Sequence, residues 1–273
     1  MGAEQNPSPL SSKVSNFAEM RAALSRLDPF DVARVPSFEP RRGAVVPSYV
    51  AAAKAPLIYI PIRGGPESVV RQWLMALDGV ESDGLRTKMN QRELRKWKRN
   101  RVGHRSFTVL RHPVARIHAA FCERILSTGE GSYPQIRQAL KKRHKVPLPQ
   151  SVTNSGYDKA AHRDTFWAFL EFVRGNLAGQ TAVRVDPAWA TQAEVVQGFG
   201  EFTLPDVILR EDTLATDLTA LAARVGYSDA PRIEPSAFHG VHALEDIYDD
   251  EIEATGADVY QRDYMMFGFD RWQ

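Results

Sequence analysis

The chain has 273 residues, of which 43% are apolar and 25% are charged, and its formal net charge is +2. This composition is typical of a globular protein with a sizeable core, and it excludes a polycation that binds nucleic acid through its overall charge. The single cysteine excludes an internal disulfide and no apolar run approaches the ~18 residues of a membrane-spanning helix, so we expect a cytoplasmic protein without a membrane span.

The N-terminal segment differs from the rest of the chain. Residues 1–14 are polar with two prolines, and Asn16 can cap a short helix over 17–27. Five prolines and little periodicity follow in residues 28–56. We therefore predict a polar N-terminal arm with one short helix over residues 1–55 and one domain over 56–273. The sequence does not set the oligomeric state.

From residue 57 onward, short apolar runs alternate with segments of helical periodicity. Strands are predicted over 57–60, 106–110 and 206–212, and helices over 69–77, 115–126, 164–177, 213–226 and 245–269. Residues 127–160 are polar and are predicted to be irregular. Strands that alternate with helices indicate an α/β fold whose mostly parallel sheet is flanked by helices.

A pair of glycines joins the first predicted strand to the next helix, in "YIPIRGGPES". The start of a helix presents free backbone N–H groups and a positive partial charge, and Gly64 and Gly65 let the backbone approach a ligand closely. No Gly-Lys-Ser/Thr follows, so this is not the loop of nucleotide triphosphatases. The pattern indicates an anion site, and a plain tight turn is the alternative.

Two arginines follow the second predicted strand, in "FTVLRHPVARIHAAF". Arg111 stands at the carboxyl end of the strand, where ligands of open α/β sheets bind, and Arg116 lies one turn inside the next helix. A guanidinium at either position can grip a phosphate with a forked pair of hydrogen bonds, and pairing with a carboxylate is the alternative. We expect the two strands to lie side by side in parallel, with Gly64, Gly65 and Arg111 lining one crevice.

Together these two stretches resemble the carbohydrate sulfotransferases that use 3′-phosphoadenosine-5′-phosphosulfate (PAPS). Those families carry I-P-K-T-G-G-T-S and F-x-x-V-R-D-P-x-x-R-x-x-S-x-Y. Three more stretches match in the family's order, "FWAFLEFV", "DPAWATQAEVV" and "IYDDEIEATGADVYQRDYMMFGF", so the resemblance spans about residues 56–270. It implies a P-loop-like sulfotransferase fold, PAPS as cofactor, and transfer of a sulfuryl group to a hydroxyl of a carbohydrate or related acceptor.

The resemblance also implies roles for individual residues. Gly64, Gly65 and Ser68 would cradle the 5′ end of PAPS. Arg111 and Arg116 would bind the cofactor, with Arg111 on its 3′-phosphate.

The chain departs from the family pattern at five positions. Ile62 stands for the lysine that stabilises the departing oxygen, Pro66 and Glu67 for hydroxyl residues, Ala119 for the 3′-phosphate serine and Ala188 for a histidine. Arg63 lies beside the missing lysine and can supply the lost positive charge, which makes it the candidate catalytic residue. The departures also leave open a different class of function, a catalytically silent relative that binds a nucleotide, a polyanion or a protein partner.

The base that deprotonates the acceptor is not assigned by the resemblance, and His239, His242 and Glu67 are candidates. Replacing Ile62 by Lys and Glu67 by Ser restores the family residues. We expect that double variant to bind the bisphosphate more tightly, because it adds a cation and removes an anion at the helix start.

Two basic runs are not explained by these motifs. Residues 86–105 hold nine Lys or Arg against one acid, with Trp97 in the middle, and "KKRHK" occupies 141–145. Such runs bind nucleic acid, an acidic glycan or cofactor phosphates, or form a solvated helix face. Two patches around one cleft suggest an anionic glycan acceptor or a tethering surface, whereas the net charge disfavours nucleic acid. No pair of histidines has helix-face metal spacing with a carboxylate, so we expect no metal site.

Overall fold

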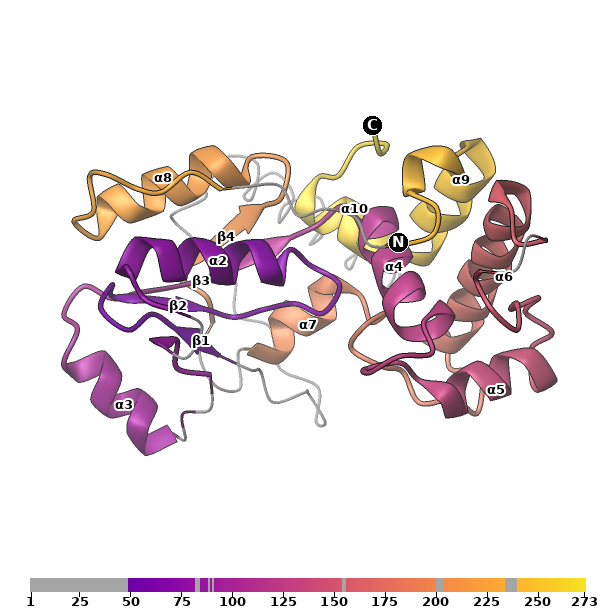
Figure 1. Cartoon of the computed structure of the whole chain (residues 1–273), viewed down its shortest axis with the longest axis horizontal. Helices are drawn as coiled ribbons and strands as arrows, with labels where there is room; N and C mark the ends of the chain where they lie inside the picture. Colours follow the sequence, from indigo (N-terminus) through magenta and orange to yellow (C-terminus); the bar gives the residue numbers. More distant parts are fainter. Residues whose placement is uncertain are drawn as a thin grey trace, which may run out of the picture.

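A computed structural model of the chain describes residues 49–81, 84–87, 89, 91–153, 156–199, 204–233 and 240–273. The rest of the predicted arm, including its helix over 17–27, lies outside the described residues. Within them the structure forms an α/β fold around a mixed sheet of strand order β1-β2-β3-β4 (Figure 1). The strands are β1 Val50–Ala51, β2 Leu57–Tyr59, β3 Arg105–Leu110 and β4 Val207–Arg210.

The three predicted strands form the parallel part of this sheet. β2 pairs with β3, and β3 with β4, both in parallel, whereas β1 pairs with β2 antiparallel. The expected side-by-side pairing of the first two predicted strands is therefore confirmed. β1 lies inside the range predicted as the arm. It forms the edge of the sheet, where Val50 and Ala51 are fully buried. The register sets Tyr59 opposite Phe107 and Leu110 opposite Arg210, which brings the carboxyl ends of the three strands to one edge.

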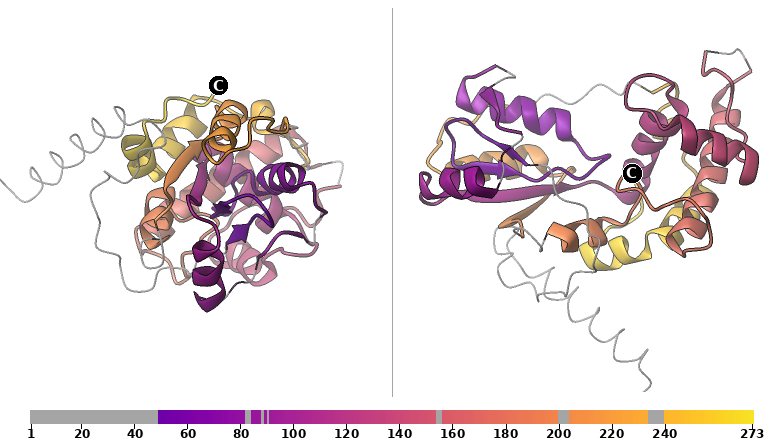
Figure 2. Two further views of the ribbon diagram at one scale, coloured as in Figure 1. Left: turned by 90° about the vertical axis from the view of Figure 1, so that its left-hand side faces the viewer. Right: turned by 90° about the horizontal axis from the view of Figure 1, so that it is seen from below.

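Helices cover both faces of the sheet and gather in a second group beyond that edge. They are α2 Glu67–Asp78, α3 Gln91–Arg99, α4 Pro113–Ala120, α5 Pro134–Arg143, α6 Lys159–Leu177, α7 Gln192–Phe199, α8 Leu214–Arg224, α9 Asp250–Val259 and α10 Gln261–Phe267. A π-helix, η3 Phe121–Leu126, continues α4, and a 3₁₀-helix, η4 Leu244–Asp246, precedes α9. In Figure 1, α2 and α8 lie on one face of the sheet and α3 on the other, while α4, α5, α6 and α9 form a separate helical group that Figure 2 shows from below.

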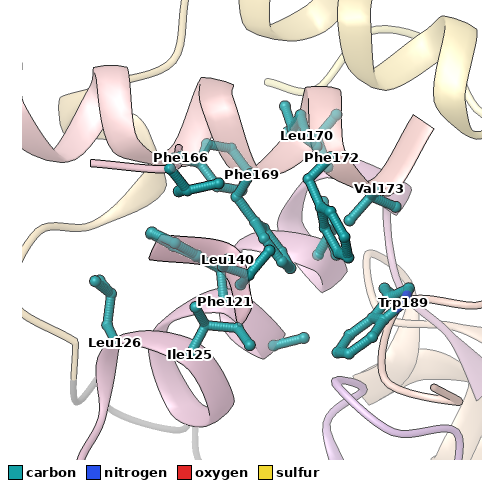
Figure 3. Close-up of a cluster of buried hydrophobic side chains, with 14 of the residues drawn as sticks. Phe121, Ile125, Leu126, Leu140, Phe166, Phe169, Leu170, Phe172, Val173 and Trp189 are labelled. Carbon is teal, nitrogen blue, oxygen red and sulfur yellow. The ribbon is translucent and has the colours of Figure 1, made fainter. Parts of the chain in front are cut away.

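The core follows the alternation of side chains along the strands. Leu57, Tyr59, Phe107 and Val109 face α2 and α8 in one buried cluster. Ile58, Ile60 and Leu110 face the other way and pack with Leu94 and Trp97 of α3. The helical group has its own cluster, drawn in Figure 3, which includes Phe121, Phe166, Phe169, Leu170 and Trp189. None of the helices in the described part of the chain is both long and apolar enough to cross a bilayer.

Two predictions about the helices are wrong. The segment 127–160 was expected to be irregular, but Pro134–Arg143 form α5 with a proline in the first turn. The signal was weak because Leu140 is the one fully buried residue of this basic helix. The helix predicted over 245–269 is instead a 3₁₀ turn followed by α9 and α10, which meet at Tyr260.

The break at Tyr260 has a tertiary cause. Its backbone, at φ −109° and ψ 25°, leaves the helical region. Its buried hydroxyl donates to the carbonyl of Trp189, 3.0 Å away. Three residues later, the buried Asp263 carboxylate accepts hydrogen bonds from the backbone N–H groups of Gln192 and Ala193, both at 2.8 Å. These contacts set the different directions of α9 and α10. The junction contains no glycine or proline that would predict the break from the sequence.

Candidate active site

The loop after β2 has the tight backbone that its glycines predict. Gly64 has φ +79°, and a Cβ there would lie 3.0 Å from the carbonyl oxygen of Arg116. The Gly65 N–H donates to the carbonyl of Ile62 at 3.0 Å, and α2 starts two residues later. Both the positive φ and the close approach of another chain segment exclude a side chain at position 64. The N-terminus of α2 therefore faces the carboxyl edge of the parallel strands.

Charges at the start of α2 are balanced within the helix. The Glu67 carboxylate accepts from Arg71 Nε at 2.8 Å, and it lies 2.7 Å from Arg71 Nη2 in an ion pair one turn away. Glu67 therefore lies along its own helix, the benign orientation considered for an acid in the first turn. Ser68 is exposed in that same turn.

Arg111 reaches the glycine loop across the crevice. Its Nη1 donates to the Gly64 carbonyl at 3.4 Å, so Arg111 and the glycine loop are in contact at the carboxyl edge of the strands. Its Nε lies 2.8 Å from Glu211 Oε2 in an ion pair whose members are 28% and 34% exposed. Burial raises the pKa of Glu211, and the charge of Arg111 opposes that shift. The Gln192 side chain fixes the Arg111 backbone, accepting from its N–H at 3.0 Å and donating to its carbonyl at 2.8 Å.

Arg116 occupies a different environment. It is 1% exposed, and its guanidinium donates to the backbone carbonyls of Arg63, Pro187 and Ala190 at 2.8, 2.7 and 2.7 Å. Burial lowers the pKa of this guanidinium. All three acceptors are main-chain atoms of two loops, so the side chain ties the glycine loop to the segment after residue 186.

Arg63, within the glycine loop, has different partners from Arg111. Its guanidinium donates to the Tyr133 hydroxyl at 3.0 Å and lies 3.6 Å from Asp186 Oδ1. The Tyr133 hydroxyl in turn donates to Asp186 at 3.2 Å. A hollow of about 380 Å³ lies beside this triad and includes Glu67 and Arg124 in its lining. Sequence analysis did not identify Tyr133, Asp186 or Arg124, although Asp186 belongs to the matched "DPAWATQAEVV" stretch.

A larger hollow, of about 530 Å³, lies on the Arg111 side of the crevice. Ala119 and Glu211 line it, and the C-terminal residues 269–273 border it. Ala119 is the position of the family's 3′-phosphate serine, so this hollow contains two of the positions that the resemblance assigns to that phosphate.

The other departed positions are buried. Ile62 is 1% exposed and packs in the cluster that contains Ile60, Leu110 and Phe269. Ala188 is also 1% exposed, and its N–H donates to Asp186 Oδ1 at 2.9 Å. A lysine side chain at position 62 would start from inside the apolar core.

The remaining predicted residues lie elsewhere. His242 Nε2 is 3.2 Å from the Tyr157 carbonyl, among the helices of the second group, and His239 lies outside the described residues. Trp97 is 2% exposed and its indole donates to the Ala52 carbonyl at 3.3 Å, so it is a core residue and not a stacking platform. The basic run "KKRHK" coincides with the exposed end of α5.

Comparison with known proteins identifies one match. Residues 67–270 match the model of the sulfotransferase family. This range begins at the first residue of α2, so it contains Arg111, Arg116 and Asp186 but not the glycine loop. No curated protein and no solved structure is similar enough to match the chain.

Proposed function

The chain belongs to the sulfotransferase family, and on that premise we propose that it moves the sulfuryl group of PAPS onto a hydroxyl of a carbohydrate or related acceptor. One observation carries this proposal. The glycine loop and Arg111 meet across the carboxyl ends of two adjacent parallel strands, 3.4 Å apart at Gly64 O and Arg111 Nη1. This edge is where open α/β sheets bind ligands, and both parts suit an anion.

In this proposal the cofactor spans the crevice. Gly64, Gly65 and Ser68 receive its 5′ end at the N-terminus of α2. Arg111 receives its 3′-phosphate in the larger hollow and releases Glu211 to do so. Arg116 acts as a positioning residue, because its donors already satisfy three backbone carbonyls of the loops around the site.

The residues around Arg63 suit the transfer step. The acceptor oxygen attacks sulfur, the bond from sulfur to the bridging oxygen breaks, and 3′-phosphoadenosine-5′-phosphate leaves with the electron pair. Negative charge then grows on the bridging oxygen, where a cation stabilises the transition state more than the ground state. Arg63 is half exposed and borders a hollow that can admit an acceptor, so it can supply this cation. Glu67 lines the same hollow and is the candidate base for the acceptor's proton, a role that requires it to leave its ion pair with Arg71.

The acceptor side favours an anionic partner. Tyr133 of the Arg63 hollow directly precedes α5, and α5 ends in the exposed cations Lys141, Lys142 and Arg143. An anionic glycan that enters the hollow would follow this helix. We therefore propose a sulfated or carboxylated carbohydrate as the acceptor class.

Ligand-induced stabilisation tests cofactor use without knowledge of the acceptor. The melting temperature of the full chain is measured with 3′-phosphoadenosine-5′-phosphate and with adenosine monophosphate at equal concentration. A shift specific to the bisphosphate is expected, since bound ligand stabilises the native state by mass action. Equal shifts, or none, would remove PAPS from the proposal.

The burial of Ile62 favours a second candidate function. The position that holds the family's catalytic lysine points into the core, so the chain can bind the nucleotide and lack transfer. A catalytically silent relative would show the bisphosphate-specific shift but release no 3′-phosphoadenosine-5′-phosphate from PAPS with any anionic glycan. An active enzyme would release it with at least one such acceptor, and Arg63→Ala would slow that release.

A further inference from the structure

Three potential metal ligands meet in the helical group, apart from the crevice. They are His118 of α4, Cys122 of the following π-helix and His162 of α6, and their ligand atoms all lie within 4.8 Å of one another. His118 Nε2 is 3.0 Å from His162 Nε2 and 3.7 Å from Cys122 Sγ. His118 and His162 are 2% and 0% exposed, and Cys122 is partly buried. The proposed sulfuryl transfer uses none of the three.

These separations suit a single tetrahedral ion. Zinc–nitrogen bonds of ~2.0–2.1 Å and a zinc–sulfur bond of ~2.3 Å at tetrahedral angles place two nitrogens about 3.4 Å apart and nitrogen and sulfur about 3.6 Å apart. Two of the three observed separations, 3.0 and 3.7 Å, differ from these values by a few tenths of an ångström, and the third, between Cys122 and His162, lies within 4.8 Å. We propose that His118, Cys122 and His162 bind one divalent ion of the zinc class through two imidazoles and one thiolate.

The local helix geometry explains how the ligands converge. His118 and Cys122 are four residues apart, which sets both side chains on one helix face. The helix changes to π-type at Phe121, and the Ser127 N–H donates to the Cys122 carbonyl five residues back, at 3.0 Å. Such π-helical turns occur frequently at functional sites. His162 comes from α6, so a bound ion would cross-link two helices of this group.

The surroundings orient one of the imidazoles. Tyr157 Oη lies 3.1 Å from Nδ1 of His162 and so leaves Nε2 of that ring directed at His118. A hydrogen bond on the second ring nitrogen is the usual arrangement for a ligating histidine. Phe121 and Phe166, both labelled in Figure 3, pack against the His118 and His162 rings and make the wall around the site apolar.

Access also suits an ion. Cys122 also lines a hollow of about 350 Å³ with Ser127, Thr128 and Ser151, which gives a route for the ion and room for water as a fourth ligand.

A hydrogen-bonded chain without metal is the competing explanation. In it the Tyr157 hydroxyl donates to His162 Nδ1, and His162 Nε2–H donates to His118 Nε2. Cys122 then remains a neutral thiol whose Sγ lies 3.7 Å from His118 Nε2. The two explanations differ in whether Cys122 is a thiolate that contacts an ion.

Cobalt spectroscopy on the tag-free full-length protein separates them. After treatment with a chelator, the protein is titrated with Co²⁺, whose tetrahedral visible bands and thiolate charge-transfer band report the ligand set. We expect one Co²⁺ per chain, with both features, and competition by Zn²⁺. Cys122→Ser should lose the charge-transfer band, and Tyr157→Phe should weaken binding by about 10–100-fold. His144→Gln, a histidine on α5's end away from the three ligands, serves as the matched control and should change neither.

The test does not depend on variants of the two buried histidines, which could fail to fold. Cys122 is only partly buried, and Tyr157→Phe keeps the aromatic ring, so both of these variants are expected to fold. Folded wild-type protein that takes up no stoichiometric Co²⁺ would overturn the proposal. So would a cobalt spectrum that is unchanged by Cys122→Ser, which would assign the ion to another site. The inference does not depend on sulfuryl transfer, since bisphosphate binding is measured separately by the melting shift.

Discussion

Replacing Arg111 by Ala should remove the preference for a 3′-phosphate. The side chain contributes to the crevice through a cation that is 28% exposed and is held at Glu211 by an ion pair of 2.8 Å. Hydrogen bonds from a charged donor contribute about 1.5–3 kcal/mol, which corresponds to about a 10- to 150-fold weaker dissociation constant for 3′-phosphoadenosine-5′-phosphate. Adenosine monophosphate lacks the 3′-phosphate, so its affinity should change by less than about threefold, because only screened long-range attraction is lost.

Glu211 complicates the single substitution, because its carboxylate is left beside the ligand when Arg111 is removed. Glu211→Gln alone should tighten bisphosphate binding, by up to about 1 kcal/mol, since it releases Arg111 from a partly exposed ion pair. The double variant then separates loss of the Arg111 contact from repulsion by Glu211. Arg174→Ala is the matched control, because it removes the same charge from an exposed ion pair on α6.

Isothermal titration calorimetry with both nucleotides provides the assay, at two salt concentrations. The reasoning is refuted if Arg111→Ala weakens both nucleotides equally, or if Arg174→Ala has as large an effect. The first result would place Arg111 at a structural position, and the second would mean that overall charge, not contact, governs binding.

Four further predictions follow from the same structure. Gly79→Ala should lower the free energy of unfolding by about 1–2 kcal/mol, because Gly79 has a left-handed φ of +60° and open space around it. Gly64→Ala should lower it by a further ~1–3 kcal/mol, because the added Cβ would lie 3.0 Å from a backbone oxygen. Urea denaturation compares the two variants. Ile62→Lys should lower the melting temperature sharply because it buries a charge, whereas the free energy of unfolding of Ile62→Met should stay within about 1.5 kcal/mol of the parent's. Equal melting temperatures of the two variants would show that the lysine reaches the crevice. His112 caps α4 through Nδ1, and burial lowers the pKa of its imidazole. As the pH drops through 6.5 the unfolded state therefore takes up a proton before the folded state does, and stability should fall. His112→Asn keeps the cap and should flatten part of that slope when melting temperature is measured against pH. Alanine at Arg95, Lys98 and Arg99 of α3 should leave the melting temperature nearly unchanged and should reduce retention on heparin if that face binds a polyanion. Unchanged retention would make it a solvated face.

Three of the four strands followed from the sequence, and so did the parallel pairing of β2 with β3, whose apolar runs are buried on both faces. β1 did not follow, because it lies in the range predicted as the arm. The helix boundaries did not follow as well. α5 buries little beyond Leu140, so its period is faint, and the break at Tyr260 depends on partners at Trp189 and Gln192 that are distant in the chain. Local pattern reports burial, whereas a change of helix direction is set by contacts between segments.

The candidate site shows the same division. The sequence predicted that both Arg111 and Arg116 bind the cofactor, and only the fold distinguishes a cation beside the glycine loop from one that binds three backbone carbonyls. The pair His118 and Cys122 carries a readable signal in its four-residue spacing, but a pattern of histidine with carboxylate does not include it. Their third partner, His162, comes from another helix and could be assigned by structure alone.

The burial of Ile62 changes the expectation for the restored loop. Sequence reasoning predicts that Ile62→Lys with Glu67→Ser tightens bisphosphate binding by adding a cation. In the structure that lysine would start inside the core, and Glu67 is already neutralised by Arg71 at 2.7 Å, so neither change delivers charge to the crevice.

In the proposed function, an anion that binds at Arg111 or Arg63 has to displace the carboxylate already paired with that arginine. Arg111 is paired with Glu211, and Arg63 lies 3.6 Å from Asp186, so the charge of each of these cations is already compensated. Both pairs are partly exposed, and pairs of this kind contribute only about 0–1 kcal/mol each. A phosphate that accepts two hydrogen bonds from one guanidinium gains more than that, so it can displace the carboxylate. The acid paired with each arginine thus lowers the affinity for weak anions such as chloride. A ligand with two phosphates can still bind, because its hydrogen bonds to the two arginines offset the loss of both ion pairs.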